Sequence, residues 1–246
     1  MKAMILAAGL GSRLKPLTDK IPKALVEVDG KPMLSRLINR LTETGYDNIV
    51  VNVHHFAYKI RDFLVNSKFS SEIKISDESD RLLDTGGSLV KAFDMLFHND
   101  DLPVLVHNVD ILSNADLGKL VKYHLNSDYA ITLLVNNRDS SRKLIFDRSG
   151  ILKGWHSLKE DKYLPENIDL KEDYKELAFS GIYVVSKESI KEMKALFGDR
   201  KFSVTEYFLH PSRKLRIGAS FQQDLILLDI GKPAALSQAS DFIKRL

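Results

Sequence analysis

The chain has 246 residues, of which 44% are hydrophobic and 28% are charged, and its formal net charge is +3. This small charge, with basic and acidic residues intermixed, argues against a nucleic-acid partner, and the absence of cysteine excludes disulfides, thiolate metal sites and cysteine nucleophiles. No early apolar run has the form of a signal peptide and none approaches the ~18–20 residues of a membrane span, so we expect a cytoplasmic protein without membrane contact.

The first predicted element is a buried strand over residues 4–8, an apolar run that leads directly into a glycine-containing loop. Gly9 and Gly11 can adopt positive φ, which turns successive backbone N–H groups toward a bound anion. Arg13 can grip a phosphate bidentately, and Lys23 adds a compact charge. The loop lacks the third glycine of a dinucleotide fingerprint and does not form a P-loop. The glycine pair by itself fits an ordinary strand-to-helix turn equally well.

Strands and helices alternate through the next hundred residues. Strands are predicted over 49–53, 72–76, 103–109 and 129–135, and apolar residues recur at helical spacing over 32–41, 57–64, 86–97 and 117–125. This alternation predicts the α/β class, with a Rossmann-like, doubly wound and mostly parallel sheet.

The pattern changes after residue 136. An antiparallel hairpin is predicted over 144–155, and the polar stretch 159–176 is expected to form a loop or a flap. Further strands are predicted over 179–185, 215–219 and 225–230, and further helices over 187–197, 204–209 and 234–246. We expect a single domain over 1–246 that contains a small antiparallel subregion.

Two aspartates follow apolar strands. Asp110 comes directly after the strand at 104–109, and Asp229 ends the strand that begins at residue 225. In open α/β sheets ligands bind at the carboxyl ends of strands, and carboxylate oxygens there are suited to Mg²⁺. Each aspartate also fits a simple turn or a helix cap.

The string from residue 6 to residue 23 resembles the signature of the sugar-1-phosphate nucleotidyltransferases. The matching residues are Leu6, Ala7, Ala8, Gly9, Gly11, Arg13, Leu14, Pro16, Leu17, Thr18, Pro22 and Lys23. These enzymes make nucleoside-diphosphate sugars from a nucleoside triphosphate (NTP) and a sugar 1-phosphate. The resemblance implies a nucleotide-binding part in 1–135 and a sugar-binding part in 136–246.

The resemblance also implies roles for individual residues. Arg13, Lys23 and Asp110 would be catalytic, and Asp110 with Asp229 would hold Mg²⁺. The nucleotide would contact Leu6, Ala7, Ala8, Gly9, Gly11, Asp84, Gly86 and Gly87, and the sugar would contact Asn52, Ser180, Gly181 and Glu206. Relatives commonly carry glycine where Val109 precedes Asp110, and often threonine where Lys232 follows Gly231. Asp84 also fits a helix N-terminus, and Glu206 an exposed helix position.

Within that family, the short chain resembles the N-acetylmuramate-1-phosphate uridylyltransferases. This likeness implies UTP and N-acetylmuramate 1-phosphate as partners, and the length predicts a monomer or a simple homodimer. GTP with a mannose- or heptose-type sugar, glucose 1-phosphate, and a catalytically silent nucleotide-sugar-binding protein are the alternatives. A glycosyltransferase is disfavoured because no Asp-x-Asp motif ends the strand before Asp110.

Overall fold

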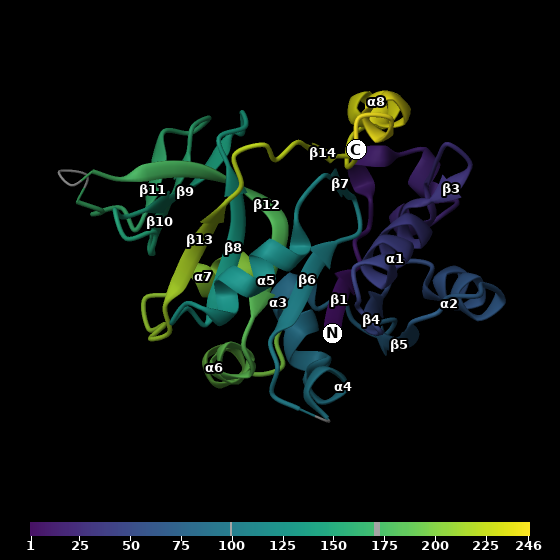
Figure 1. The fold of residues 1–246 in the computed structure, drawn as a ribbon, viewed down its shortest axis with the longest axis horizontal. Helices are drawn as coiled ribbons and strands as arrows, with labels where there is room; N and C mark the ends of the chain where they lie inside the picture. Colours follow the sequence, from purple (N-terminus) through teal and green to yellow (C-terminus); the bar gives the residue numbers. More distant parts are fainter. Residues whose placement is uncertain (99, 170–172) are drawn as a thin grey trace.

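A ten-stranded mixed sheet runs through the computed structural model, which describes residues 1–98, 100–169 and 173–246 (Figure 1). Its main path has the order β11-β10-β9-β12-β6-β1-β4-β5; off this path β8 pairs with β12, and β13 pairs with β8. The strands are β1 (Lys2–Leu6), β4 (Asn48–Val53), β5 (Glu72–Asp77), β6 (Val104–Asn108), β8 (Ile131–Asn136), β9 (Arg142–Phe146), β10 (Leu152–Ser157), β11 (Lys162–Leu164), β12 (Lys175–Val185) and β13 (Ile217–Phe221).

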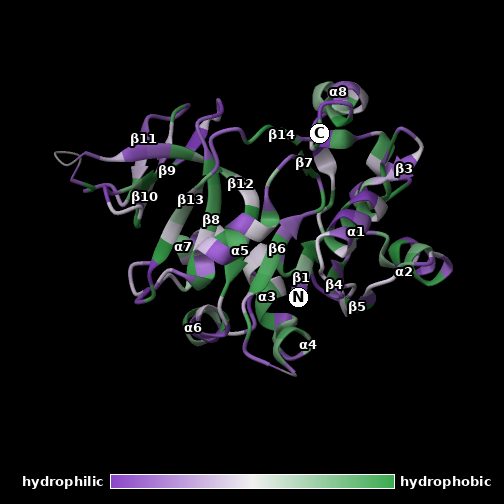
Figure 2. Cartoon of the chain, viewed as in Figure 1, coloured by the Kyte–Doolittle hydropathy of each residue, from purple (hydrophilic) through white to green (hydrophobic). Residues whose placement is uncertain are grey.

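Helices cover both faces of this sheet. On one face, α1 (Met33–Glu43), α2 (Ala57–Asn66) and α5 (Leu117–Leu125) share a hydrophobic core with alternate residues of β1, β4 and β6. On the other face lie α3 (Asp84–Lys91), α4 (Phe93–Phe97), α6 (Lys187–Phe197) and α7 (Val204–Phe208). The central strands β6 and β8, buried on both faces, are largely hydrophobic in Figure 2. The predicted doubly wound α/β architecture is therefore confirmed.

The functional edge of the sheet follows from strand direction. β5, β4, β1 and β6 are parallel neighbours, whereas β12 runs antiparallel to both β6 and β8. Consequently β8 runs in the same direction as β6, and the carboxyl ends of β1, β4, β6 and β8 meet at one edge. Binding residues in open α/β sheets are expected at this edge.

The antiparallel subregion contains more than the predicted hairpin. β9 and β10 pair as expected, but β11 adds a third strand within the stretch predicted as a loop, and β12 begins at Lys175. The polar composition of 159–169 concealed this strand, because an exposed edge strand needs no apolar alternation. The rest of the predicted flap at 170–172 lies outside the described residues.

The carboxyl-terminal segment returns to the first half of the chain. β14 (Leu227–Asp229) pairs antiparallel with β7 (Ile111–Ser113), and α8 (Pro233–Ile243) packs against Val28, Met33 and Leu112. A short hairpin of β2 (Glu27–Val28) and β3 (Lys31–Pro32) completes this side. None of the helices in the described ranges combines the length and hydrophobicity that a bilayer span requires.

Candidate active site

A cleft of about 240 Å³ opens where β1, β4 and β6 end. Its wall includes the segment from Leu6 to Gly9 after β1, Asn52 in β4, and the segment from Asn108 to Asp110 after β6. Leu82, Asp84, Thr85 and Ser88 line it from the start of α3, and Lys23 from the η3 turn (Lys23–Leu25). The structure thus brings together most of the predicted nucleotide-binding and catalytic residues.

The loop after β1 is held in one conformation by its own contacts. Gly11 has φ +65° and its carbonyl accepts hydrogen bonds from the Leu14 amide at 2.8 Å and the Thr18 hydroxyl at 2.8 Å. A Cβ on Gly11 would lie 2.7 Å from the Thr18 methyl carbon, so glycine is required both by φ and by space. Gly9 does not share the positive φ and has open space around it.

Lys23 and Asp110 form an ion pair at the base of the cleft. Only 11% of the lysine side chain and 15% of the aspartate side chain are exposed. Charges that are this poorly hydrated interact more strongly than surface pairs, which fixes both groups at the cleft. The two residues come from segments 87 positions apart.

Three charged side chains converge at Gly231, and a fourth joins them through an ion pair. A Cβ there would lie 2.7 Å from Nη2 of Arg13, 2.8 Å from Oδ1 of Asp229 and 3.0 Å from Nζ of Lys23. Lys23 in turn pairs with Asp110, so two cations and two carboxylates form one cluster. Any side chain at 231 would push this cluster apart, which explains the glycine.

Pairing of β14 with β7 places Asp229 beside Asp110. Asp229 lies opposite Ile111 in the ladder, and the Ile230 amide donates to the Asp110 carbonyl at 3.0 Å. The Asp229 carboxylate accepts a hydrogen bond from the Gly231 amide at 2.8 Å, which orients it. The sequence separation of 119 positions between Asp110 and Asp229 is bridged by this short two-stranded sheet.

The donor set at Asp110 and Asp229 fits Mg²⁺. Both groups are carboxylates, the oxygen ligands that this ion prefers, and Mg²⁺ is commonly held by one or two carboxylates plus substrate phosphates and water. Across the described ranges, no three His, Cys, Asp or Glu side chains gather in a way that could hold a metal by themselves. The pair therefore suits an ion that shares its coordination shell with a phosphate ligand.

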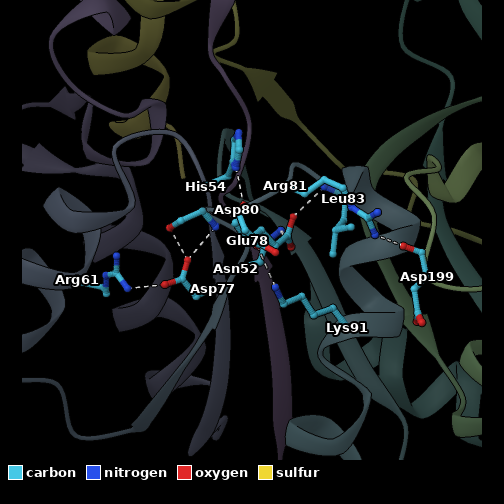
Figure 3. Close-up of polar contacts among 11 residues, drawn as sticks. Asn52, His54, Arg61, Asp77, Glu78, Asp80, Arg81, Leu83, Lys91 and Asp199 are labelled. Atoms are coloured by element: carbon cyan, nitrogen blue, oxygen red, sulfur yellow. Dashed lines mark hydrogen bonds and ion pairs between the residues drawn. The ribbon is translucent and has the colours of Figure 1, made fainter.

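A buried polar network holds the end of β1 in place. Figure 3 shows two of its members, Asn52 and Glu78. Asn52, only 2% exposed, accepts from the Ala7 amide at 2.6 Å and donates to Glu78 at 2.9 Å and to Ser88 at 2.9 Å. Glu78 is fully buried, and its second carboxylate oxygen accepts from the Leu83 amide at 3.2 Å. Asn52 therefore lies in the cleft wall with its amide engaged inside the protein; its predicted sugar contact stays a prediction.

Glu78→Gln is expected to lower the free energy of unfolding by about 1–3 kcal/mol, the cost of leaving a buried polar group unpaired. The carboxylate accepts from two donors, Asn52 and the Leu83 amide, whereas an amide turns one of these contacts into a donor–donor clash. Urea unfolding measures the change, and exposed Glu160→Gln is the matched control. A stability equal to that of the control variant would contradict this role.

The start of α3 is shaped by packing on its far side. A Cβ on Gly86 would lie 2.2 Å from the Phe202 ring, and one on Gly87 would lie 3.0 Å from the Arg200 carbonyl oxygen. The cleft wall here is formed by Asp84 and Thr85. Asp84, with φ +61°, accepts from the Thr85 amide, and neither residue is the N-cap. Nucleobase contact by the two glycines stays a prediction.

The other three predicted sugar residues, Ser180, Gly181 and Glu206, lie in the second half of the chain. Ser180 is buried and donates to the Leu134 carbonyl at 2.7 Å, and Gly181 approaches the Asn108 amide, which would lie 2.7 Å from an added Cβ. Glu206 accepts from the Ser203 amide at 2.9 Å in the capping box of α7. Glu206 also lines a second, larger cleft of about 550 Å³, with Arg142, Lys143, Trp155, Phe179, Ser203 and Thr205 among its other lining residues.

The two clefts are neighbours. The Val204 amide donates to the Thr85 hydroxyl at 2.8 Å, and Thr85 lines the first cleft while Ser203 and Thr205 line the second. Sequence reasoning missed Glu78, which is fully buried and accepts a hydrogen bond from Asn52 in the wall of the first cleft. The available signal for Glu78 was its position just after a predicted strand, the same signal that identified Asp110.

Comparison with known proteins identifies a matching family model and several similar proteins. Residues 2–146 match the family model described as nucleotidyl transferase. N-acetylmuramate alpha-1-phosphate uridylyltransferase of Caulobacter vibrioides is 42% identical over 111 residues, 44% of this chain and 45% of that protein. Mannose-1-phosphate guanylyltransferase 1 of Arabidopsis thaliana is 33% identical over 144 residues, 58% of this chain and 40% of that protein. The alignments thus span about half the length of these curated relatives.

Solved structures share the fold over almost the whole chain. HddC from Yersinia pseudotuberculosis superposes with a TM-score of 0.77 at 25% identity, covering 98% of this chain and 99% of that one. A putative glucose-1-phosphate thymidylyltransferase from Bacillus anthracis, 19% identical, gives 0.78 and covers 100% of this chain and 96% of that one. The resemblance first indicated by residues 6–23 is confirmed.

Proposed function

The chain belongs to the nucleotidyl transferase family, and we propose that it transfers a nucleotidyl group from an NTP to a sugar 1-phosphate. A phosphate oxygen of the sugar 1-phosphate attacks the α-phosphorus of the NTP. The bond from the α-phosphorus to the oxygen bridging to the β-phosphorus breaks, and pyrophosphate leaves with the electron pair. The attacking oxygen is already ionised near neutral pH, so no general base is required.

The main barrier to this reaction is repulsion between two anions. The cluster around Gly231 is the observation that carries the proposal, because Arg13 and Lys23 offer positive charge beside two carboxylates at the cleft. Preorganised cations that approach the reacting phosphates lower the barrier by positioning and charge stabilisation. Mg²⁺ bound by Asp110 and Asp229 would neutralise further phosphate charge.

For the substrates we propose UTP and N-acetylmuramate 1-phosphate. N-acetylmuramate differs from N-acetylglucosamine by a lactyl ether that carries a carboxylate. Arg142 and Lys143 line the second cleft beside Trp155, and neither forms an ion pair with any residue in the described ranges. A cationic, partly aromatic cleft next to the reaction site supports an acidic sugar. We further propose a cytoplasmic monomer or simple homodimer.

Pyrophosphate release from purified protein tests both the proposed reaction and the proposed substrates. With Mg²⁺ present, UTP and N-acetylmuramate 1-phosphate are expected to react at least about tenfold faster than other pairs, a ratio that a few pocket contacts can supply. N-acetylglucosamine 1-phosphate is the matched acceptor, since it lacks only the lactyl group. GTP with mannose 1-phosphate tests the guanylyltransferase alternative.

The outcomes separate the alternatives. Faster turnover with GTP and mannose 1-phosphate would overturn the substrate assignment and keep the reaction class. Binding of nucleotide sugars without pyrophosphate release from any pair would overturn the reaction and favour a silent binding protein.

A further inference from the structure

Arg138 is a cation at the functional edge that no sequence pattern singled out. It follows β8 by two residues, and β8 ends at the same edge of the sheet as β1 and β6. It therefore occupies the same kind of position as Asp110, on the half of the sheet that also carries Phe179 and Ser180. Its segment, 137–141, leads directly into β9.

The Arg138 guanidinium is fixed to β12. Its Nη2 donates to the Phe179 carbonyl at 2.9 Å, and its Nη1 makes a longer contact of 3.4 Å to the Asp139 carbonyl. The backbone carbonyl of Arg138 accepts from Nζ of Lys143 at 2.7 Å, which steadies the loop. These contacts engage the two Nη groups of the guanidinium and do not involve its Nε–H edge.

That remaining edge has no hydrogen-bond partner among residues 1–98, 100–169 and 173–246. The Nε atom is buried and makes no hydrogen bond with the described part of the chain, although buried donors are nearly always paired. No carboxylate in residues 1–98, 100–169 or 173–246 lies within ion-pair distance of Arg138. A guanidinium offers its Nε and Nη groups together to a carboxylate or a phosphate, so an anionic ligand would satisfy it.

The electrostatic surroundings point to the reaction site. Burial lowers the pKa of Arg138, and the negative charge of Asp229 acts in the opposite direction. Asp229 is the residue that meets Arg13 and Lys23 at Gly231. Arg138 is therefore influenced by the same carboxylate that meets the two cations of the first half of the chain.

We propose that Arg138 binds the phosphate of the sugar 1-phosphate acceptor, an assignment that rests on the proposed function. Lys23 lines the first cleft, and Arg13, in the loop after β1, meets it at Gly231. Arg138 is bonded to Phe179, which lines the second cleft on the sugar side. A phosphate on this side, placed next to Asp229, would approach the nucleotide while Arg138 offsets the repulsion between the two anions.

Arg138→Gln tests the assignment by steady-state kinetics. The KM for the sugar 1-phosphate is expected to rise about 10- to 100-fold, as for loss of hydrogen bonds to a charged group, while the KM for the NTP stays within about twofold. In the reverse reaction, the KM for the nucleotide sugar rises and that for pyrophosphate does not. Arg138→Lys keeps the positive charge but lacks the paired N–H donors of a guanidinium. It is expected to recover part of the lost affinity for the sugar 1-phosphate.

Arg148→Gln is the matched control, because Arg148 is 79% exposed and its ion-pair partner in the described ranges is Asp173, at 3.6 Å. If Arg138 served only to hold its loop against β12, Arg138→Gln would lower the melting temperature and change the KM values for the sugar 1-phosphate and the NTP equally. That result overturns the assignment. An unchanged acceptor KM in Arg138→Gln also overturns it. A wild-type protein that releases no pyrophosphate overturns the proposed function itself, and the assignment falls with it.

Discussion

Asp110→Ala is expected to lower the kcat for pyrophosphate release about 100- to 1,000-fold, the loss usual for removing one preorganised electrostatic contact. Asp110 pairs with Lys23 at the cleft and lies beside Asp229, so its removal takes away a proposed Mg²⁺ ligand and frees Lys23 at once. The fold should persist, because the Asp110 backbone contact to Ile230 does not involve the side chain.

The control for this variant is Asp94→Ala, which removes an exposed aspartate from α4. Asp110→Asn keeps the shape and removes the charge, so it separates packing from electrostatics. Its kcat is expected to fall as far as that of the alanine variant. A kcat within about threefold of wild type would show that Asp110 does not take part in the reaction.

Lys23→Ala is expected to lower kcat by a similar factor, about 100- to 1,000-fold, for a different reason. Lys23 is the cation of the cluster that is both largely buried and paired, and burial makes its charge more effective at the reacting phosphates. Its removal leaves Asp110 without its ion-pair partner and takes one of the two cations from the cluster. Pyrophosphate release at saturating substrate concentrations measures the change.

Lys15→Ala serves as the comparison for Lys23→Ala. Lys15 lies in the same loop, is 62% exposed and pairs with Asp19 at 3.0 Å, so its loss should leave kcat nearly unchanged. Circular dichroism and the melting temperature check that each variant is folded. Equal kcat values for the Lys23 and Lys15 variants would remove Lys23 from the reaction.

The central strands and the helices that cover them were predictable, because their apolar runs are repeated at strand or helical spacing. β1, β4 and β6 fall where the apolar runs indicated, within one or two residues of the predicted ends. β11 escaped prediction because it is three residues long, none of them buried, within an otherwise polar stretch. The expected single helix over 86–97 is divided into α3 and α4 at Ala92, which no glycine or proline marked.

The predicted site residues were recognisable from local order along the chain. The glycine loop, Arg13 and Lys23 stand within about twenty positions, and Asp110 directly follows an apolar strand. Such signals depend on backbone geometry at a strand end, which neighbouring residues largely determine. They indicated a phosphate-binding half and a metal-binding half of one site.

Contacts between distant segments, by contrast, were decided only by the tertiary structure. Pairing of β14 with β7 brings Asp229 to Asp110, and the missing side chain of Gly231 leaves room for Arg13 and Lys23 beside them. The burial of Glu78 and the unpaired Nε of Arg138 likewise arise from packing between strands far apart in the chain. By itself the sequence determined which residue types end which strands; packing determined which of those ends meet, because burial and pairing depend on neighbours that sequence order does not specify.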